Sequence, residues 1–183
     1  MIELDESLTQ WINGLSAHFA AVDKLMIAIS AVGVPILVLA VALQWWTGAD
    51  RTRTRHALIA SGLAFILGLA INQIILLMLF RVRPYDAGIT QLLIAPSADP
   101  SFPSDHATAT FAIAAALLLQ GLPRRGTLFL LAALVVSFSR IYIGIHYASD
   151  ALGGALTGVL AAVIVTIAYR RDTRLDRMLT NIF

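Results

Sequence analysis

Residues 139–150 read SRIYIGIHYASD, which sets an arginine, a histidine and a carboxylate among apolar residues typical of a membrane-embedded helix hairpin. An ionisable side chain inside a membrane segment costs about 2.5–3.5 kcal/mol on insertion scales, so its presence indicates a functional site. His146 and Asp150 are four residues apart and are expected on one helix face, where a carboxylate can hold an imidazole in one tautomer. Arg140 brings a planar guanidinium suited to phosphate oxygens. The stretch therefore indicates phosphate-ester chemistry at a membrane surface.

The composition of the chain is that of an integral membrane protein. Of its 183 residues, 58% are hydrophobic and 13% are charged, whereas a soluble domain averages about 25% charged residues. The formal net charge is +2 and the basic residues fall into short clusters, which argues against nucleic-acid binding. The chain contains no cysteine, so disulfides and thiolate metal sites are excluded. We expect one membrane domain over residues 1–183.

The apolar runs predict an all-α integral membrane protein with about five transmembrane helices. Three runs are uncharged and near the ~20 residues that a helix needs to cross a bilayer. Two are weaker, because one is short and the other contains Arg140 near its end. Each of these is a span only if its outer polar residues lie in a protein-lined cavity. The predicted spans are about 25–47, 57–80, 107–122, 127–143 and 151–169, the third and fourth being the weaker ones.

Two further features refine this topology. Apolar residues recur at helical spacing over residues 4–20, with polar residues such as Asp5 and Asn13 between them. This pattern predicts an amphipathic helix that lies on the membrane interface. In the last span, the small residues Gly154 and Gly158 would let a neighbouring helix approach closely.

The arginines predict the orientation of the chain in the membrane. Nine of the thirteen Lys and Arg residues lie in the loop after the first span, the loop after the third span and the C-terminal tail. With five spans these three segments share one side, and Lys and Arg collect in cytoplasmic loops. We therefore expect the N-terminus outside and the C-terminus inside. The same topology gathers six polar residues at the outer membrane surface, namely Arg83, Ser104, His106, Arg140, His146 and Asp150.

Three segments resemble the three signature motifs of the type 2 phosphatidic acid phosphatase superfamily. They are Arg83-Pro84, Pro103-Ser104-Asp105-His106, and Ser139-Arg140 followed by His146 and Asp150. The second has Asp105 where most members have glycine, a variant similar to the bacterial undecaprenyl-diphosphate phosphatase branch. The first departs further, because Leu76 stands where the family usually has a lysine seven residues before the arginine. Three motifs in order make the resemblance specific over residues 57–169.

The resemblance implies a role for each motif residue. His146 would be the nucleophile that forms a phosphohistidine, with Asp150 orienting its ring. His106 would protonate the departing oxygen and then activate the hydrolytic water. Arg83 and Arg140 would clamp the phosphoryl oxygens as charge redistributes.

Three more residues are candidates for phosphate binding. Ser104 is a candidate N-cap of the third span, where its hydroxyl and the free backbone N–H groups could bind an anion. Asp105 could cap the same helix or tune His106. Arg81 could be a surface charge, or it could replace the lysine that is missing at Leu76. No cofactor is implied, and the carboxylates and histidines form no further cluster that would predict a metal site.

The predicted function is a lipid phosphatase of the bacterial plasma membrane, with its site facing the periplasm or the exterior. The resemblance favours a polyprenyl diphosphate substrate, undecaprenyl diphosphate in particular, and leaves the oligomeric state open. One alternative is a phosphatidic acid or phosphatidylglycerophosphate phosphatase, and another is a transporter or channel that uses the charged residues as a relay. The connection 85–102 is long enough to be functional, and it either covers the site or packs at the interface. His18 and His56 have no partner in the motifs and are interpreted as interfacial residues.

Overall fold

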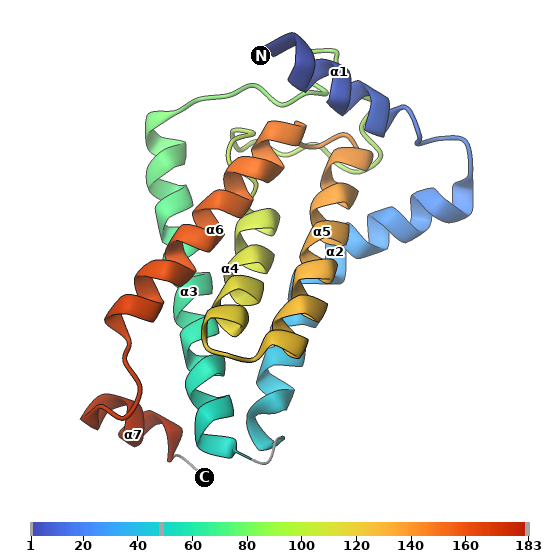
Figure 1. Ribbon diagram of the computed structural model, residues 1–183. Helices are drawn as coiled ribbons and strands as arrows, with labels where there is room; N and C mark the ends of the chain where they lie inside the picture. Colours follow the sequence, from blue (N-terminus) through green and yellow to red (C-terminus); the bar gives the residue numbers. More distant parts are fainter. Residues whose placement is uncertain (1, 48–49, 182–183) are drawn as a thin grey trace.

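The structure is a computed structural model that describes residues 2–47 and 50–181, and all regular structure in these ranges is helical (Figure 1). The N-terminal helix and two long helices come first, and a long connection separates them from the remaining helices. The elements are α1 (Ile2–Asn13), α2 (Ala20–Leu43), the 3-10 turn η1 (Gln44–Trp46), α3 (Arg51–Met78), α4 (Asp105–Leu119), α5 (Pro123–Tyr142), α6 (Ala148–Ala168) and α7 (Arg174–Thr180).

Within the described residues, four helices are long and apolar enough to cross a membrane: α2 with η1, α3, α5 and α6. The fifth predicted span forms α4, which has 15 residues and a length of about 22 Å, less than the ~30 Å of a bilayer core. It can be short because it lies at the centre of the bundle and packs against α3, α5 and α6 (Figure 1). Its buried residues are mostly small, with Ala and Thr predominating.

Small residues allow α6 to lie close to α4, as the sequence predicts. A Cβ atom on Gly158 would lie 2.5 Å from the backbone oxygen of Thr108, and one on Gly154 would overlap the backbone oxygen of Ser104. Larger side chains at either position would push the two helices apart. The spacing of α4 and α6 matters because both helices begin at the candidate site.

Several helix bounds differ from the predicted ones. The interfacial helix predicted over 4–20 ends at Asn13, and Ala17 adopts a left-handed backbone conformation with φ of 64°. The helix predicted from residue 57 begins at Arg51, because the Asp50 carboxylate accepts a hydrogen bond from the Arg53 N–H and caps its first turn. The sequence reading also missed α7.

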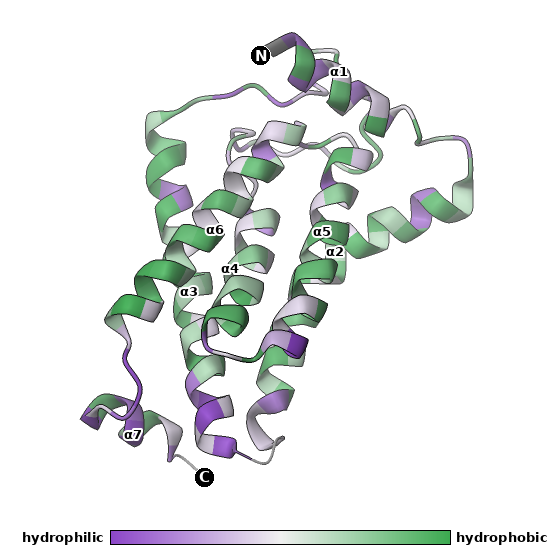
Figure 2. Cartoon of the chain, viewed as in Figure 1, coloured by the Kyte–Doolittle hydropathy of each residue, from purple (hydrophilic) through white to green (hydrophobic). Residues whose placement is uncertain are grey.

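The bundle has two chemically different ends (Figures 1 and 2). At one, which we call the site end, α3 and α5 finish, α4 and α6 begin, and α1 lies across the top. The opposite end, which we call the arginine end, has hydrophilic residues at the start of α3 and in the short α7. The nine clustered arginines belong to this second end, at positions 51, 53, 55, 124, 125, 170, 171, 174 and 177.

The sequence analysis interpreted His56 as an interfacial residue with no partner in the motifs, but the structure buries it among partners. It is 3% exposed, and its two ring nitrogens lie 2.7 Å from Asp176 Oδ1 and 3.1 Å from Gln120 Oε1. Its ring also stacks on Tyr169, with centroids 4.7 Å apart. The cluster ties α7 to the arginine end of the bundle.

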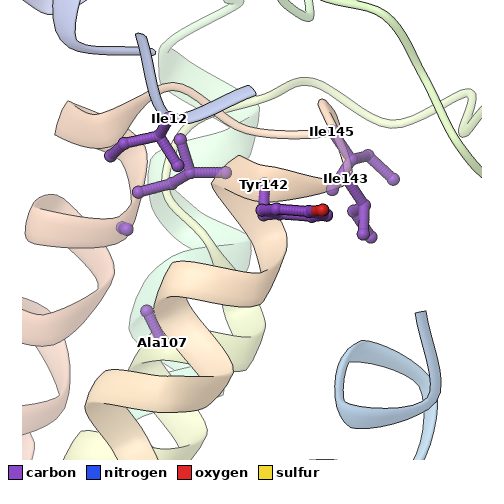
Figure 3. Close-up of a cluster of buried hydrophobic side chains, with 7 residues drawn as sticks. Ile12, Ala107, Tyr142, Ile143 and Ile145 are labelled. Atoms are coloured by element: carbon purple, nitrogen blue, oxygen red, sulfur yellow. The ribbon is translucent and has the colours of Figure 1, made fainter. Parts of the chain in front are cut away.

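The core of the site end joins α1 to the loop between α5 and α6 (Figure 3). Ile12 of α1 packs in one buried cluster with residues 141–143 and Ile145. Leu92, Leu93 and Ile94 of the long connection pack against this cluster. The apolar patch of the connection is therefore part of the protein core.

Candidate active site

A cavity of about 250 Å³ opens at the site end, where four segments meet. They are the end of α3, the long connection after it, the start of α4, and the end of α5 with its following loop. The cavity brings together five of the eight residues predicted for the site, while Ser104, Asp150 and Arg81 lie outside its lining. The lining consists of Gln73, Leu76, Arg83, Ser97, Asp99, Pro100, Pro103, Asp105, His106, Arg140 and His146.

The orientation of the His146 ring fixes which nitrogen is available for chemistry. Its Nδ1 lies 2.8 Å from the backbone oxygen of Ser101. A carbonyl oxygen can only accept, so Nδ1 carries the proton and Nε2 of the neutral ring keeps its lone pair. The Asp150 carboxylate lies farther away, with Oδ2 3.5 Å from Nδ1. The carbonyl therefore makes the closer contact and sets the tautomer, with the carboxylate behind it.

The surroundings of His146 also favour its neutral form. The ring is buried, and burial lowers the pKa of His146 because it disfavours the charged imidazolium. The positive charges of Arg140 and Arg83 lower this pKa further, while the Asp150 carboxylate opposes them. At neutral pH the ring is uncharged and its Nε2 can act as a nucleophile or base.

Asp150 is fully buried at the first turn of α6. Its Oδ2 accepts hydrogen bonds from the Ser101 hydroxyl at 2.5 Å and from the Tyr147 N–H at 2.8 Å. Its Oδ1 accepts one from Arg81 at 2.5 Å. Ser101 thus links the two predicted partners, because its hydroxyl binds Asp150 and its backbone oxygen binds His146.

Two buried arginines, Arg83 and Arg140, line the cavity together with the acidic residues Asp99 and Asp105. The Arg83 guanidinium donates to the backbone oxygens of Asp99 at 2.8 Å and Ile145 at 3.0 Å, which ties the long connection to the loop before α6. Arg140 Nη1 donates to the Ser30 hydroxyl at 2.5 Å. The Arg140 Nε is buried and has no hydrogen-bond partner among the described residues.

Ser104 lies at the N-cap position of α4, as predicted, but its side chain makes no capping hydrogen bond. Its hydroxyl is buried without a partner in the described part of the chain. Its backbone N–H donates to the backbone oxygen of Asp150 at 3.1 Å. Ser104 therefore holds the starts of α4 and α6 together.

Asp105 and the position of the missing lysine lie beside each other on the cavity wall. The Asp105 carboxylate lines the cavity and accepts a hydrogen bond from Asn72 at 2.7 Å. Leu76 lines it too, and the polar side chain that α3 adds near Leu76 is Gln73. Arg81 is engaged elsewhere, because its guanidinium binds Asp150 and, at 2.6 Å, Asp5.

The sequence reading missed several residues of the site. Ser97, Asp99 and Ser101 come from the long connection, and Gln73 comes from α3. None of them stands in a recognisable motif, and three of the four lie in a segment without regular structure. In the ranges 2–47 and 50–181, no group of three or more His, Cys, Asp or Glu side chains is arranged to hold a metal ion.

Comparisons with known proteins identify the family of the chain. The family model described as the PAP2 superfamily matches residues 57–174. Undecaprenyl-diphosphatase BcrC of Bacillus subtilis (strain 168) is 36% identical over 149 residues, which cover 81% of this chain and 76% of that protein. The bacitracin transport permease protein BcrC of Bacillus licheniformis is 30% identical over 165 residues, covering 89% and 79%.

A solved structure shares the fold. The crystal structure of the first transmembrane PAP2 type phosphatidylglycerolphosphate phosphatase from Bacillus subtilis superposes with a TM-score of 0.66 at 21% identity. The match covers 94% of this chain and 87% of the other. The arrangement of membrane helices is therefore common to both proteins.

Proposed function

Because this chain belongs to the PAP2 superfamily and is a multi-pass membrane phosphatase, we propose that it hydrolyses undecaprenyl diphosphate, or a similar polyprenyl diphosphate, to the monophosphate. The observation that carries the proposal is the His146 ring. Its Nδ1 is held by a carbonyl, so its Nε2 is left for a cavity that two arginines line. This combination suits nucleophilic attack on phosphorus.

In the proposed reaction, His146 Nε2 attacks the terminal phosphorus and the bond to the bridging oxygen breaks. The lipid monophosphate leaves with the electron pair of that bond, and His106, entering as the imidazolium, supplies the proton to the departing oxygen. Burial, Arg140 and His146 lower the pKa of His106 to about 3, and the negative charge of the bound diphosphate would raise it again. Water then attacks the phosphohistidine, His106 takes a proton from it, and inorganic phosphate leaves. Arg83 and Arg140 stabilise the charge on the phosphoryl oxygens in both steps.

An apolar groove beside the cavity supports a lipid substrate. It measures about 280 Å³, shares Asp105 and His106 with the cavity, and runs between α2 and α3. Its remaining lining is apolar: Ala31, Val34, Pro35, Phe65, Leu69 and Ala109. A prenyl chain lying there would leave its diphosphate in the cavity that Arg83 and Arg140 line.

We also propose that the arginine end is cytoplasmic and that the site faces the outside of the plasma membrane. The nine clustered arginines support this orientation, because Lys and Arg are enriched in cytoplasmic loops. The diphosphate headgroup would then be hydrolysed on the outer surface.

One experiment compares the candidate functions directly. Purified protein in detergent is given polyprenyl diphosphate, phosphatidic acid or phosphatidylglycerophosphate, with a chelator present, and phosphate release is measured. We expect the highest kcat/KM on the polyprenyl diphosphate and no inhibition by the chelator. Preference for either phospholipid would contradict the substrate, and loss of activity that Mg²⁺ restores would contradict the metal-free mechanism.

A transport function is the second candidate, because one relative is named a transport permease. In that case the protein would release no phosphate from any of the three lipids. Phosphate release that His146→Ala abolishes would exclude transport as the basis of the activity.

A further inference from the structure

The N-terminal helix turns its polar side toward the protein. Asp5, Thr9 and Asn13 are four residues apart and lie on one face of α1, where each makes hydrogen bonds to the site end. Apart from the buried Ile12, large apolar residues of α1 are exposed: Leu4 is 74% exposed and Trp11 is 66% exposed. A helix that only rested on the membrane would leave its polar face in water, so this polar face has another function.

That polar face caps the helix that carries Asp150. The N-cap residue of α6 is Tyr147, which is a poor capping residue. The side chains of α1 supply the missing acceptors: Thr9 Oγ1 accepts from the N–H of residue 148 at 3.0 Å, and Asp5 Oδ1 accepts from the Ser149 N–H at 2.8 Å. Asp5 Oδ2 also accepts from the Ser149 hydroxyl. Two otherwise free N–H groups at the start of α6 are thus satisfied from α1.

Arg81 connects the Asp5 carboxylate to Asp150. Its Nη2 donates to Asp5 Oδ2 at 2.6 Å, and its Nη1 donates to Asp150 Oδ1 at 2.5 Å and to the Ser149 hydroxyl at 2.7 Å. Its guanidinium carbon lies 3.8 Å from the ring centroid of Tyr147. Asp150 is fully buried, and a buried carboxylate needs a paired charge of this kind.

The chain of contacts reaches the proposed nucleophile. Arg81 holds one oxygen of Asp150, and the other oxygen binds Ser101, whose backbone oxygen binds His146 Nδ1. A displaced Asp150 would therefore change both the ring position and the field at Nδ1. Arg81 itself does not line the cavity.

We propose that α1 positions the pair His146 and Asp150 for catalysis. Asp5 and Arg81 act as positioning residues: they hold Asp150, and through it His146, in the reactive geometry. The proposal rests on the proposed function, because it assigns the residues that support its nucleophile. Arg81 then acts on the catalytic step and does not bind the headgroup.

The kinetic constants separate positioning from headgroup binding. For Arg81→Ala we expect kcat to fall roughly 10–100-fold while KM changes by less than about threefold, because the substrate contacts remain. A headgroup ligand would instead raise KM, and more for a diphosphate than for a monophosphate lipid. Arg81→Lys should recover part of kcat, since it keeps the charge and loses the fork geometry.

The coupling between α1 and Arg81 is tested with a double-mutant cycle. Asp5→Asn should lower kcat by roughly 3–10-fold, and the double variant Asp5→Asn/Arg81→Ala should be no slower than Arg81→Ala alone, because both act on Asp150 through one guanidinium. Glu3→Gln is the matched control: Glu3 is an exposed acid on the same helix, and its substitution should leave kcat unchanged. Melting temperatures in detergent show whether each variant is folded at the assay temperature.

All variants are assayed on polyprenyl diphosphate and on phosphatidic acid beside wild type and His146→Ala. Wild-type kcat in Arg81→Ala, or additive effects in the cycle, would overturn the positioning role even if His146→Ala is inactive. Activity of the wild type on phosphatidic acid alone would overturn the proposed substrate, and the cycle would then be read on that lipid.

Discussion

Each end of this bundle buries a histidine beside an aspartate, and the two pairs differ in what the rest of the ring contacts. At the arginine end, His56 binds Asp176 through one nitrogen and contacts Gln120 through the other. At the site end, the hydrogen bond of His146 within the described part of the chain is made by Nδ1, and its side chain lines a cavity. A buried His–Asp pair is therefore not a sign of catalysis by itself. The available nitrogen and the open space beside it make the difference.

The charges around the two pairs differ in the same way. Tyr169 covers the His56 ring, and its hydroxyl donates to Asp176. Burial raises the pKa of Tyr169, and the hydrogen bond to Asp176 raises it further. Among the described residues no aromatic ring stacks on His146, and Arg83 and Arg140 line the adjoining cavity. The first pair holds α7 against the bundle, and we propose that the second meets an anionic substrate.

The largest expected difference between the pairs is in turnover. His146→Ala should lower kcat by at least ~10⁴-fold, because it removes the attacking nitrogen. His56→Ala should leave kcat within about threefold of wild type when it is assayed well below its melting temperature. Phosphate release from polyprenyl diphosphate measures both. Similar losses in the two variants would mean that the ends are not specialised as described.

Asp150 and Asp176 should differ in the same way as the two histidines, with smaller effects. Asp150→Asn should lower kcat by roughly 10²–10³-fold, since it disturbs the charge behind Nδ1 and leaves the nucleophile in place. Asp176→Asn should instead cost about 1–3 kcal/mol of stability, as one buried acceptor loses its charge. Turnover and thermal melting of each variant check the division. A large kinetic loss in Asp176→Asn alone would reverse the assignment.

The sequence predicted the site end better than the arginine end, for a physical reason. The catalytic candidates stand in short motifs whose order along the helices places them together, so the positions of His106, Arg140 and His146 around one cavity could be anticipated. His56 and Asp176 are 120 residues apart, and no local pattern connects them. The same distance along the chain hid the contact between α1 and α6.

The fold was predictable where hydrophobicity alone decides it. The long apolar runs became α2, α3, α5 and α6, while some helix ends differ from the predicted ones, as at the start of α3, where the Asp50 side chain caps the first turn. Periodicity predicted α1 as an amphipathic helix but not the contacts of its polar face, because a sequence shows that a face is polar and not what it contacts. Asp105 as a headgroup ligand stays a prediction, whereas the hydrogen bonds of Arg81 to Asp150 and Asp5 favour the positioning role proposed above.

A smaller effect concerns pH. Burial, with the charges of Arg140 and Arg83, lowers the pKa of His146 despite the opposing Asp150. The ring therefore stays neutral at pH values somewhat below about 6.5, the usual pKa of histidine. The acid limb of kcat/KM should therefore lie below pH 6.5. A profile from pH 4.5 to 8 measures it. If kcat/KM already begins to fall above pH 7 as the pH is lowered, the Asp150 carboxylate outweighs burial in setting the pKa of His146.

The orientation of the two ends has no expected effect on activity, and labelling tests it. The chain has no cysteine, so single cysteines at Ser97 and Arg53 can be reacted with a membrane-impermeant reagent in intact cells. We expect labelling of Ser97→Cys from outside and of Arg53→Cys only after permeabilisation. The opposite pattern would place the site in the cytoplasm.

The covalent intermediate tests the difference between the two histidines most directly. Polyprenyl diphosphate labelled in its terminal phosphate is mixed with protein, the reaction is stopped within milliseconds with alkaline detergent, and protein-bound label is measured. Wild type and His56→Ala should carry label that is stable to base and lost in acid, as a phosphohistidine is, and His146→Ala should carry none. Label that persists in His146→Ala would contradict the assignment of His146 as the nucleophile.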